Sequence, residues 1–430
     1  MIWATIFGSL VAFVVTSAAL GAVLGLTGFI VLQFYAHGAT GIAIQAVYTA
    51  LNSVALSAVP MFILLGEILL VSGISKRIYN SVTPLLYFIP GGLMHTNIVV
   101  CTLFGAASGS STATAAAVGS VAYPELTRRG YDKRAVTGAL AAGGTLGLLI
   151  PPSLSLLIYG AWQDVSVGRL FLAGILPGVM MTALFMGFIA VQAIRRPDLL
   201  PAQGGPPTIG EIFRNLLNIW PLVVLVGAVL GSIYAGLATP TESAGLGVAA
   251  AIIMGFAFGE LTIPQLWTAA RHTVGSLGAI FLILIGAVVL GQSISILGLP
   301  RQLIEAVSAS GLGPNEILLI VTLMYVALGC IFDGLSLMLI TVPFLYPMMM
   351  TQGFDPVWFG VYVTVMIEIG MITPPVGVNL FVLVAITRGN VSLAQAARAS
   401  LPYWVLMLFG ALLLTLFPSI ALLLPQLVYQ

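Results

Sequence analysis

Two short polar segments interrupt long apolar stretches of the chain, and they carry oxygen ligands suited to binding ions. The first is Ser108-Gly109-Ser110-Ser111-Thr112-Ala113-Thr114, and the second is Gly329-Cys330-Ile331-Phe332-Asp333-Gly334-Leu335-Ser336. A carboxylate such as Asp333 costs about 2.5–3.5 kcal/mol at the centre of a bilayer on insertion scales, so we expect it to have a function there. That function is a place at or beside a cation site, or an N-cap on the following helix, and the two roles are compatible.

Each polar segment is followed, at a similar distance, by a pair of prolines. Pro151-Pro152 begins 42 residues after Gly109, and Pro374-Pro375 begins 40 residues after Gly334. Two successive prolines break a membrane-spanning helix, because proline removes a backbone donor and clashes with the preceding turn. The break frees carbonyl groups that favour a cation and exposes a helix N-terminus that favours an anion. A proline pair can also simply kink a packed helix, but the matched spacing favours a site for a cation and an anion.

The composition indicates that these segments lie in a membrane. Charged residues make up 6% of the 430 residues, hydrophobic residues make up 60%, and the mean hydropathy is +1.13. Soluble proteins carry about 25% charged residues. The net charge of +1 gives no indication of nucleic-acid binding. We expect Cys101 and Cys330 to be packing residues without a disulfide, and we expect no cofactor beyond coupling ions.

The apolar segments can be laid across a bilayer, since a helix needs about 20 residues to cross it. On this rule we predict spans at 2–17, 18–35, 53–74, 135–161, 169–194, 216–236, 241–258, 275–297, 357–386 and 402–424. Twelve basic residues then fall on one side, and only Arg169 and Arg301 fall on the other. Because basic residues favour the cytoplasmic side, the first side is predicted to be cytoplasmic and both termini to lie outside.

Neither polar segment fits a single crossing in this arrangement. The segment from Pro90 to Tyr123 has cytoplasmic basic residues on both sides, so it must enter the membrane and return. Its returning arm, Thr112 to Pro124, would rise only about 20 Å as a helix. The segment from Ile317 to Met350 behaves in the same way from the outer face. We therefore predict two re-entrant hairpins whose tips meet at a central site, because irregular backbone at this depth needs protein or water around it.

The two halves of the sequence also repeat each other. Gly147-Leu-Leu-Ile-Pro151-Pro152 corresponds to Gly370-Met-Ile-Thr-Pro374-Pro375, and the matching loops face opposite sides. The predicted fold is an all-helical polytopic membrane protein with about ten transmembrane helices and two re-entrant helical hairpins in inverted repeats. Inverted repeats with interrupted helices are typical of secondary transporters.

Four stretches carry a resemblance to a known family. They are Phe104 to Tyr159, Val165-Ser166-Val167-Gly168 with the later Pro177-Gly178, Thr239-Pro240-Thr241-Glu242, and Glu368 to Phe381. In this order, and over essentially the whole chain, the sequence resembles the large membrane subunit of tripartite ATP-independent periplasmic (TRAP) transporters.

The resemblance implies a mechanism and a set of partners. Sodium would be the coupling ion, and a soluble periplasmic binding protein would deliver a small organic acid to the bacterial inner membrane. A domain holding both hairpins and both broken helices would slide, like an elevator, against a fixed scaffold. A smaller four-helix membrane subunit would sit beside the large one, surrounded by lipid. Because this sequence ends without a fused small subunit, we expect that subunit to be a separate chain.

The resemblance also implies site residues, which lie at the tips and the breaks. One sodium site would involve Ser108, Gly109, Ser110, Ser111, Gly143, Gly144, Thr145 and Pro151, and the other Gly329, Asp333, Gly370, Thr373 and Pro375. Hard oxygen donors of this kind suit sodium. Candidates for substrate contact are Ser110, Ser111, Thr112, Thr114, Ser153, Ser336 and Asn379. Hydroxyl groups in membrane helices also bond to the helix backbone, which is the alternative role for these residues.

Three glutamates have less direct interpretations. Glu368, two residues before Gly370, is either a partner or proton site near the second break or one half of a pair within the bundle. We interpret Glu67 as structural, anchoring a helix contact. Glu242 is interpreted as a helix-capping residue at an outer membrane edge.

The elevator interpretation divides the chain into six segments. The predicted scaffold comprises 1–80, 169–274, 275–315 and 393–430, and the predicted transport domain comprises 81–168 and 316–392. The amphipathic segments 38–55 and 261–274 are predicted to be arms along the membrane surface, with plain loops as the alternative.

Other functions fit the sequence less well. A stand-alone sodium- or proton-coupled carboxylate carrier of a related elevator superfamily would work without a binding protein. An intramembrane hydrolase needs a membrane-embedded nucleophile and a base, but His95, the nearest histidine to Ser108, precedes the hairpin arm. A channel does not fit two tips that act as closed gates. We therefore predict a transporter subunit that performs no chemistry on its substrate.

Overall fold

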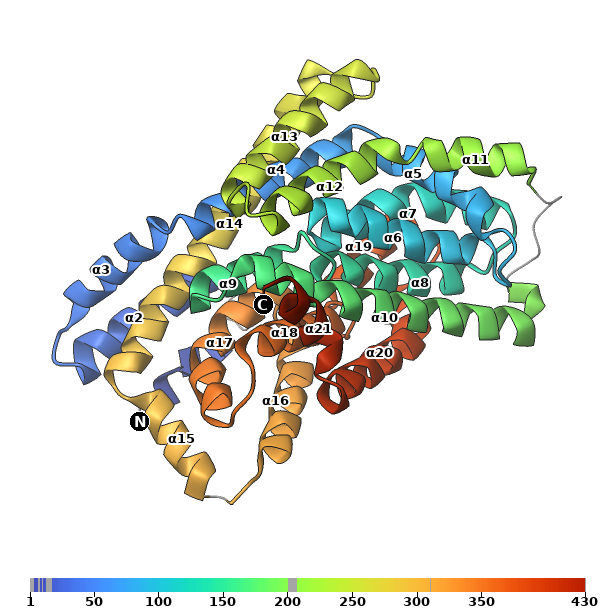
Figure 1. Cartoon of the computed structure of the whole chain (residues 1–430). Helices are drawn as coiled ribbons and strands as arrows, with labels where there is room; N and C mark the ends of the chain where they lie inside the picture. The colour runs from blue at the N-terminus through green and yellow to red at the C-terminus, as the bar shows by residue number, and fades with distance from the viewer. Residues whose placement is uncertain are drawn as a thin grey trace.

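The structure is a computed structural model that describes residues 4–6, 8–9, 11–12, 18–199, 207–309 and 311–429. Within these residues the chain is helical and contains no strand (Figure 1). The predicted span 2–17 lies mostly outside the described residues. The expectation of an all-helical fold is confirmed.

The helices follow one another with short connections. Those of the first half are α2 (Leu20–Tyr35), α3 (Thr40–Leu51), η1 (Ala55–Ser57), α4 (Ala58–Val71), α5 (Ile74–Val82), η2 (Thr83–Leu86), α6 (Leu93–Ser108), α7 (Ser111–Arg128), α8 (Lys133–Thr145), η3 (Leu146–Leu148), α9 (Leu154–Gln163), α10 (Val167–Arg195) and η4 (Pro197–Leu199). Those of the second half are α11 (Ile209–Leu217), α12 (Trp220–Tyr234), α13 (Pro240–Ala257), α14 (Ile263–Ile296), α15 (Leu299–Ala309), α16 (Pro314–Gly329), α17 (Gly334–Thr351), α18 (Pro356–Met371), α19 (Val378–Ile386), α20 (Leu393–Leu416) and α21 (Ser419–Val428).

Five of the described helices are long and apolar enough to cross a membrane, namely α10, α13, α14, α17 and α20. Two bent pairs, α3 with α4 and α11 with α12, could each count as one more, and they bend by 57° and 41°. Several other apolar helices, including α2, α16 and α18, are shorter. The chain is therefore a membrane protein in which many helices are broken or short.

The predicted hairpins and broken helices are present. Helices α6 and α7 form the first hairpin, and α16 and α17 form the second. The predicted span 135–161 is split into α8 and α9 around Pro151-Pro152, and the span 357–386 is split into α18 and α19 around Pro374-Pro375. Both proline pairs contain a cis peptide bond.

Three sequence-based boundaries are wrong. Helix α7 runs through Pro124 to Arg128, so the returning arm has 18 residues and is longer than predicted. One proline removes only one backbone donor, and the turns on either side keep the helix intact. The predicted arm 261–274 is the first part of the continuous 34-residue helix α14, so the division at 274/275 falls inside a helix. The predicted span 402–424 crosses the end of α20 at Leu416, and α21 begins at Ser419 after a break at Phe417 and Pro418.

Polar contacts join segments that the basic residues place on the same side of the membrane. Arg77 Nη1 lies 3.2 Å from Glu260 Oε1, and Lys133 Nζ lies 3.2 Å from Asn390 Oδ1. All four residues belong to loops predicted to be cytoplasmic. On the predicted outer side, the Arg169 guanidinium lies 5.6 Å from the centre of the Tyr429 ring. The predicted orientation is thus compatible with the packing.

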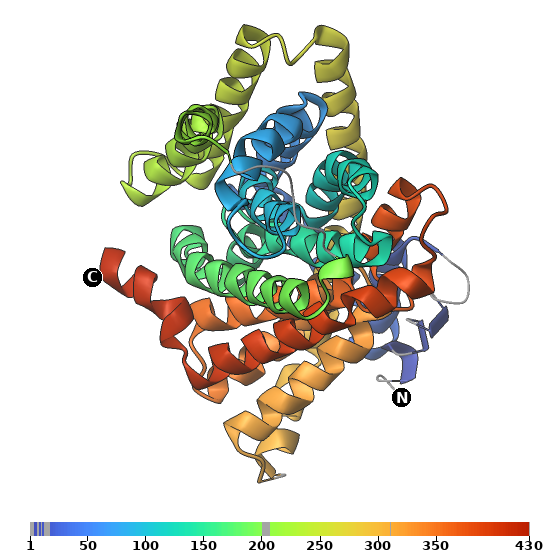
Figure 2. The same ribbon diagram turned by 90° about the vertical axis from the view of Figure 1, so that its right-hand side faces the viewer.

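Close helix packing depends on glycine along the α2–α14 interface. A Cβ on Gly21 would lie 2.2 Å from the Leu282 carbonyl oxygen, and one on Gly28 would lie 2.6 Å from the Leu290 nitrogen. Small residues allow this backbone approach in membrane proteins. Figures 1 and 2 show that α13 stands at one end of the molecule and α15 and α16 at the opposite end. The long helix α14 connects these ends, and α17 of the second hairpin packs against it.

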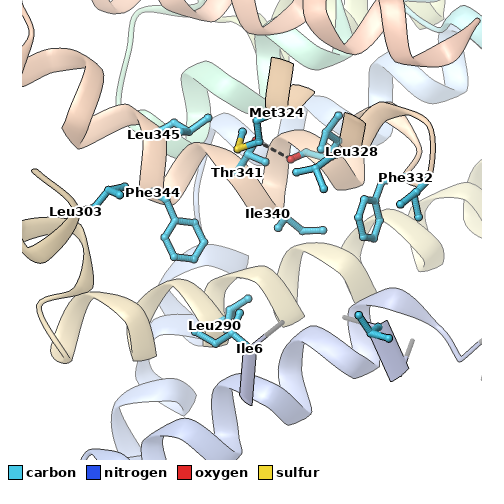
Figure 3. Close-up of a pocket in the computed structure, with 13 residues that line it drawn as sticks. Ile6, Leu290, Leu303, Met324, Leu328, Phe332, Ile340, Thr341, Phe344 and Leu345 are labelled. Atoms are coloured by element: carbon cyan, nitrogen blue, oxygen red, sulfur yellow. Dashed lines mark hydrogen bonds between the residues drawn. The ribbon is translucent and has the colours of Figure 1, made fainter. Parts of the chain in front are cut away.

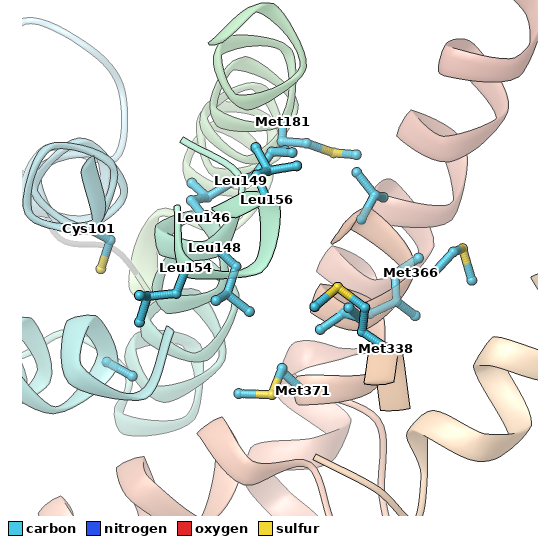
Figure 4. Packing of buried hydrophobic residues seen from close by; sticks show 14 of the residues in the cluster. Cys101, Leu146, Leu148, Leu149, Leu154, Leu156, Met181, Met338, Met366 and Met371 are labelled. Carbon is cyan, nitrogen blue, oxygen red and sulfur yellow. The ribbon is translucent and has the colours of Figure 1, made fainter. Parts of the chain in front are cut away.

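The two halves of the chain share a buried apolar core. Figure 4 shows leucines of the first break, including Leu148 and Leu154, on one side and Met338, Met366 and Met371 of α17 and α18 on the other. All five side chains are buried. This core holds the first break and the second hairpin in one packed unit.

Candidate functional site

The tip of the first hairpin is built by a glycine and a serine cap. Gly109 ends α6 with φ +63°, a left-handed conformation that glycine adopts without strain. Ser110 is extended, and its Oγ accepts a hydrogen bond from the Ala113 nitrogen as the N-cap of α7. The Gly109 carbonyl accepts a hydrogen bond from the Leu154 nitrogen at 3.3 Å. The first tip therefore contacts the point where the chain restarts as α9 after the first break.

The tip of the second hairpin is arranged in a similar way. Asp333 caps α17 by accepting from the Ser336 nitrogen at 3.2 Å, and the Ser336 hydroxyl also donates to the Asp333 carboxylate. The Cys330 carbonyl accepts from the Val376 nitrogen at 3.2 Å, just after the second proline pair. The second tip therefore contacts the second break.

A glycine pair brings each hairpin against its broken helix. A Cβ on Gly105 would lie 2.5 Å from Gly147 Cα, and a Cβ on Gly329 would lie 2.8 Å from Gly370 Cα. Gly147 and Gly370 are the residues matched in the sequence repeat. The two halves thus use equivalent backbone contacts, and the inverted repeat extends to the geometry of the site.

A cavity of about 390 Å³ lies between the first tip and helices α4 and α14. The hairpins, α9 and α19 contribute Ser108, Ser110, Thr112, Ala113, Ala116, Leu154, Leu335 and Val382, and α4 and α14 contribute Ile63, Gly66, Glu67, Leu70, Ser276 and Ile280. Leu335 comes from the second hairpin, so both hairpins reach this cavity.

Three helices begin at the cavity wall. Thr112 is in the first turn of α7, Leu154 starts α9, and Leu335 is in the first turn of α17. The first N–H groups of a helix have no partner within the helix and carry partial positive charge. No lysine or arginine is among the described lining residues. The Leu154, Ala113 and Ser336 nitrogens already donate to Gly109, Ser110 and Asp333. Backbone N–H groups of the first turns that remain free suit a small anion.

The structure separates the predicted substrate residues into two groups. Ser110 and Thr112 line the cavity, as does Ser108 from the predicted sodium site. The other predicted substrate residues, Ser111, Thr114, Ser153, Ser336 and Asn379, are buried and bonded to protein. Thr114, for example, donates to the Ser110 carbonyl at 2.7 Å and pairs with Ser108 Oγ at 3.0 Å.

Asn379 connects the two halves of the molecule. Its Nδ2 donates to Ser111 Oγ at 2.7 Å and to the Ala141 carbonyl at 3.2 Å, and all three residues are buried. We expect Asn379→Ala to lower the free energy of unfolding by about 1–3 kcal/mol, because two buried groups lose their partner. Thermal unfolding in detergent checks this, with the exposed Asn390→Ala as the control. Equal midpoints for the two variants would contradict it.

The predicted sodium residues lie at the tips and breaks, but not all of them face the tips. A Cβ on Gly143 would contact the Cys101 side chain and one on Gly144 would contact Ala115, so both glycines serve helix packing. Thr145 donates to the Ala142 carbonyl within its own helix. Thr373 donates to the Ile369 carbonyl at 2.5 Å and accepts from Trp404 Nε1 at 3.0 Å.

Oxygen atoms do gather where the first tip meets the first break. The Pro152 carbonyl oxygen would lie 2.7 Å from a Cβ on Gly109, and the Ser110 carbonyl would lie 3.0 Å from a Cβ on Gly147. The hydroxyl groups of Ser108 and Thr114 are beside them. Hard oxygen donors of this kind fit an alkali cation. At the second tip, Asp333 and Pro375 are exposed, while Gly370 and Thr373 are buried.

Two residues that contribute to the site were not predicted from the sequence. Gly105 is the counterpart of Gly329, and alignment of the two repeats around Gly147 and Gly370 could have identified it. Glu67 was interpreted as a helix anchor, and its contact with His272 on α14 at 3.4 Å agrees with that role, but Glu67 also lines the cavity. Nothing in its local sequence indicates which face of α4 meets a hairpin tip.

Glu368 is fully buried, and within the described residues neither carboxylate oxygen has a hydrogen-bond partner of good geometry.

Two further cavities differ in polarity from the one at the tip. A cavity of about 370 Å³ between α14, α15 and the second hairpin is lined by apolar side chains and Thr341 (Figure 3). The Thr341 hydroxyl is already bonded to Leu337 and Tyr325, so this cavity offers little to an ion. A polar cavity of about 720 Å³ lies between α3, α14, the end of α9 and Pro343 of the second hairpin.

Comparison with known proteins shows the family to which this chain is related. The family model for the tripartite ATP-independent periplasmic transporter, DctM component, matches residues 7–420. The C4-dicarboxylate TRAP transporter large permease protein DctM of Pseudomonas aeruginosa is 32% identical over 409 residues, which cover 94% of this chain and 93% of that protein. The isethionate TRAP transporter permease protein DctMQ of Oleidesulfovibrio alaskensis is 31% identical over 424 residues, which cover 96% of this chain and 65% of that protein.

A solved structure has a similar fold. The YdaH transporter of Alcanivorax borkumensis superposes with a TM-score of 0.65 at 16% sequence identity, and the match covers 89% of each chain. At this identity the likeness concerns the fold alone. From the family match and the nearly full-length relatives, the chain belongs to the DctM family, the large permease subunits of TRAP transporters.

Proposed function

We propose that this permease is the sodium-coupled importer of a small organic anion, and that it works by an elevator mechanism with a periplasmic binding protein. The observation that carries the proposal is the cavity at the first tip. Both hairpins, the first broken helix and two scaffold helices meet around its volume of about 390 Å³. A volume of this order suits a small molecule.

The polarity of the cavity supports an anion as the substrate. Serine and threonine hydroxyl groups and the first turns of α7, α9 and α17 face it, with no described lysine or arginine in the lining. In secondary transporters with interrupted helices, half-helix N-termini hold anionic groups and freed carbonyls hold the coupling ion. Relatives are named for C4-dicarboxylate and isethionate transport. We therefore propose an organic acid as the substrate class.

The oxygen-rich junctions of tip and break support sodium as the coupling ion. At each junction a glycine pair holds two backbones together. The Pro152 and Ser110 carbonyl groups lie close to the first pair, and the Gly329 carbonyl lies close to the second. Ser108 and Thr114 would add hydroxyl ligands at the first junction, and Asp333 would add a carboxylate at the second. These sites need no soft ligand, and sodium is the hard cation that the family resemblance implies.

The positions of two cavities along α14 support alternating access. The tip cavity contacts Ser276 and Ile280, whereas the polar cavity contacts Gln292 and Ser295. Residues 276 and 292 are separated by about 24 Å along a helix. With the Arg271 end of α14 predicted to be cytoplasmic, the polar cavity lies toward the outside. Movement of the hairpins along α14 would carry a bound anion from the outer cavity to the inner one.

The partners follow from the family. The match to DctMQ covers only 65% of that relative, which is named as one permease protein. We propose that a small membrane subunit accompanies this chain in the inner membrane, and that a soluble binding protein delivers the substrate.

Uptake into proteoliposomes tests the proposal. The chain is reconstituted with the small subunit and the binding protein proposed for it, and radiolabelled four-carbon acids such as succinate and 4-hydroxybutyrate are added. We expect uptake with an inward sodium gradient and none with potassium. Uptake that is independent of sodium would contradict the coupling. Uptake by this chain alone would instead favour a stand-alone carboxylate carrier.

A further inference from the structure

We infer that Glu67 selects the substrate by accepting a hydrogen bond from a donor group at the end of the substrate opposite its anionic group. The inference rests on the proposed function, and it narrows the substrate class. The favoured substrate is an organic anion with an ammonium or hydroxyl group, and a second carboxylate at that position is disfavoured.

Glu67 occupies a distinct position in the cavity. It lies on α4, on the scaffold wall, and it is the one ionisable residue among the described lining residues. The three helix N-termini belong to the facing wall, formed by the hairpins and α9. The cavity therefore has an electropositive backbone side and an opposing carboxylate side. A ligand that satisfies both sides must carry an acceptor at one end and a donor at the other.

The carboxylate of Glu67 has one long contact, to His272, among the described residues. Its side chain is 16% exposed, and Oε2 has no hydrogen-bond partner of good geometry among the described residues. His272 Nδ1 on α14 is 3.4 Å from Oε2, and the His272 side chain is 61% exposed. This neighbour can offset part of the negative charge. At 3.4 Å from Oε2, His272 satisfies this largely buried acceptor only weakly, so a closer donor on the ligand would be favourable.

The backbone places Glu67 beside the tip. The preceding residue, Gly66, packs so closely that a Cβ there would lie 2.9 Å from the Ser108 carbonyl oxygen. Helix α4 therefore contacts the hairpin backbone directly, and the next side chain faces the cavity. The two lining hydroxyl groups of Ser110 and Thr112 begin α7 in the same cavity.

Four acids with the same chain length test the inference. Butyrate, 4-hydroxybutyrate, 4-aminobutyrate and succinate share one carboxylate and differ only at the opposite end. Their binding to the reconstituted transporter is measured at saturating sodium for wild type and for Glu67→Gln. We expect wild type to prefer 4-aminobutyrate and 4-hydroxybutyrate over succinate. Glu67→Gln should reduce the preference for 4-aminobutyrate over succinate by about tenfold or more, because a charge-assisted hydrogen bond becomes a neutral one and repulsion is removed.

Two variants serve as comparisons. Glu305→Gln removes an exposed carboxylate on α15, far from the cavity lining, and should leave the preference unchanged. His272→Gln removes the neighbour of Glu67 and should keep or increase the preference for 4-aminobutyrate, a change opposite to that of Glu67→Gln.

The outcomes separate this inference from the proposed function. Sodium-coupled uptake with the same preferences in wild type and Glu67→Gln would overturn the role of Glu67 alone. A fall in the 4-aminobutyrate preference for His272→Gln would also overturn it. Failure of wild type to bind any of the four acids would overturn both the organic-acid substrate and this inference.

Discussion

Gly105→Ala should lower sodium-driven uptake by about 10- to 100-fold while the protein still reaches the membrane. The new Cβ would lie 2.5 Å from Gly147 Cα, and this backbone atom cannot rotate away as a side chain could. Overpacking of this kind costs about 1–3 kcal/mol, and the most direct relief is to move the hairpin away from the first break. Any such shift separates the carbonyl and hydroxyl groups that would hold the cation.

The repeat gives this prediction an internal comparison. Gly329→Ala should have the same effect at the second junction, where the new Cβ would lie 2.8 Å from Gly370 Cα. Gly187→Ala on α10 is the matched control, because nothing lies within 4 Å of its added Cβ and alanine is the better helix former. Initial uptake rates and sodium titrations measure the effect. If Gly105→Ala transports as well as Gly187→Ala, the two backbones do not need to touch.

Asp333→Asn should abolish sodium-driven uptake with little loss of stability. Asparagine caps a helix about as well as aspartate, so α17 would keep its start, but the negative charge at the second tip would be lost. Asp333→Ala should abolish uptake as well, and it should also destabilise the fold by about 0.5–2 kcal/mol because the cap is removed. Comparison of the two variants separates the charge of Asp333 from its capping bonds to Ser336.

A second aspartate cap provides the control. Asp355 is exposed and accepts from the Val357 and Trp358 nitrogens at the start of α18, away from either tip. Asp355→Asn should therefore transport normally. Thermal unfolding and uptake are measured on the same preparations. Normal uptake by Asp333→Asn would show that the residue acts only as a cap and would remove it from the cation site.

The central features of the fold could be predicted from sequence because they depend on local chemistry. A double proline interrupts a helix because it removes backbone donors and clashes with the preceding turn. A run such as Ser108-Gly109-Ser110 favours a helix end and a new N-cap, because glycine adopts the left-handed conformation and serine caps the next helix. Both signals are independent of packing, and both occur twice at matched spacing. The two hairpins and the two broken helices are present accordingly, with their tips against the breaks.

The features that were missed depend on packing between distant segments. A single proline, Pro124, lies inside α7 because its neighbours in the bundle support the helix. Helix α14 continues through 274 because its polar first turns and its apolar remainder are equally compatible with a helix. The bond between Asn379 and Ser111 joins residues 268 positions apart, and no local pattern indicates it.

The roles of individual polar residues were the hardest to predict for the same reason. Hydroxyl residues at a tip can face the cavity, as Ser110 and Thr112 do, or turn inward, as Thr114 does. The direction in which a hydroxyl group points depends on the face of the helix that carries it, and the geometry of the turn before the helix sets that face. Glu67 has apolar sequence neighbours and would suit a structural contact equally well. Only the close approach of Gly66 to Ser108 places it in the cavity wall.

The most direct test of the account asks whether water and ligand reach the first tip. Ser110→Cys is introduced with Cys330→Ser, since Cys101 is fully buried, and a water-soluble maleimide is applied from each side of the membrane. We predict labelling from the cytoplasmic side that slows when sodium and a transported acid are both present. Leu412→Cys, on the exposed face of α20, should react only with a lipid-soluble reagent. Reaction of Ser110→Cys with the lipid-soluble reagent alone would contradict a central cavity at the hairpin tip.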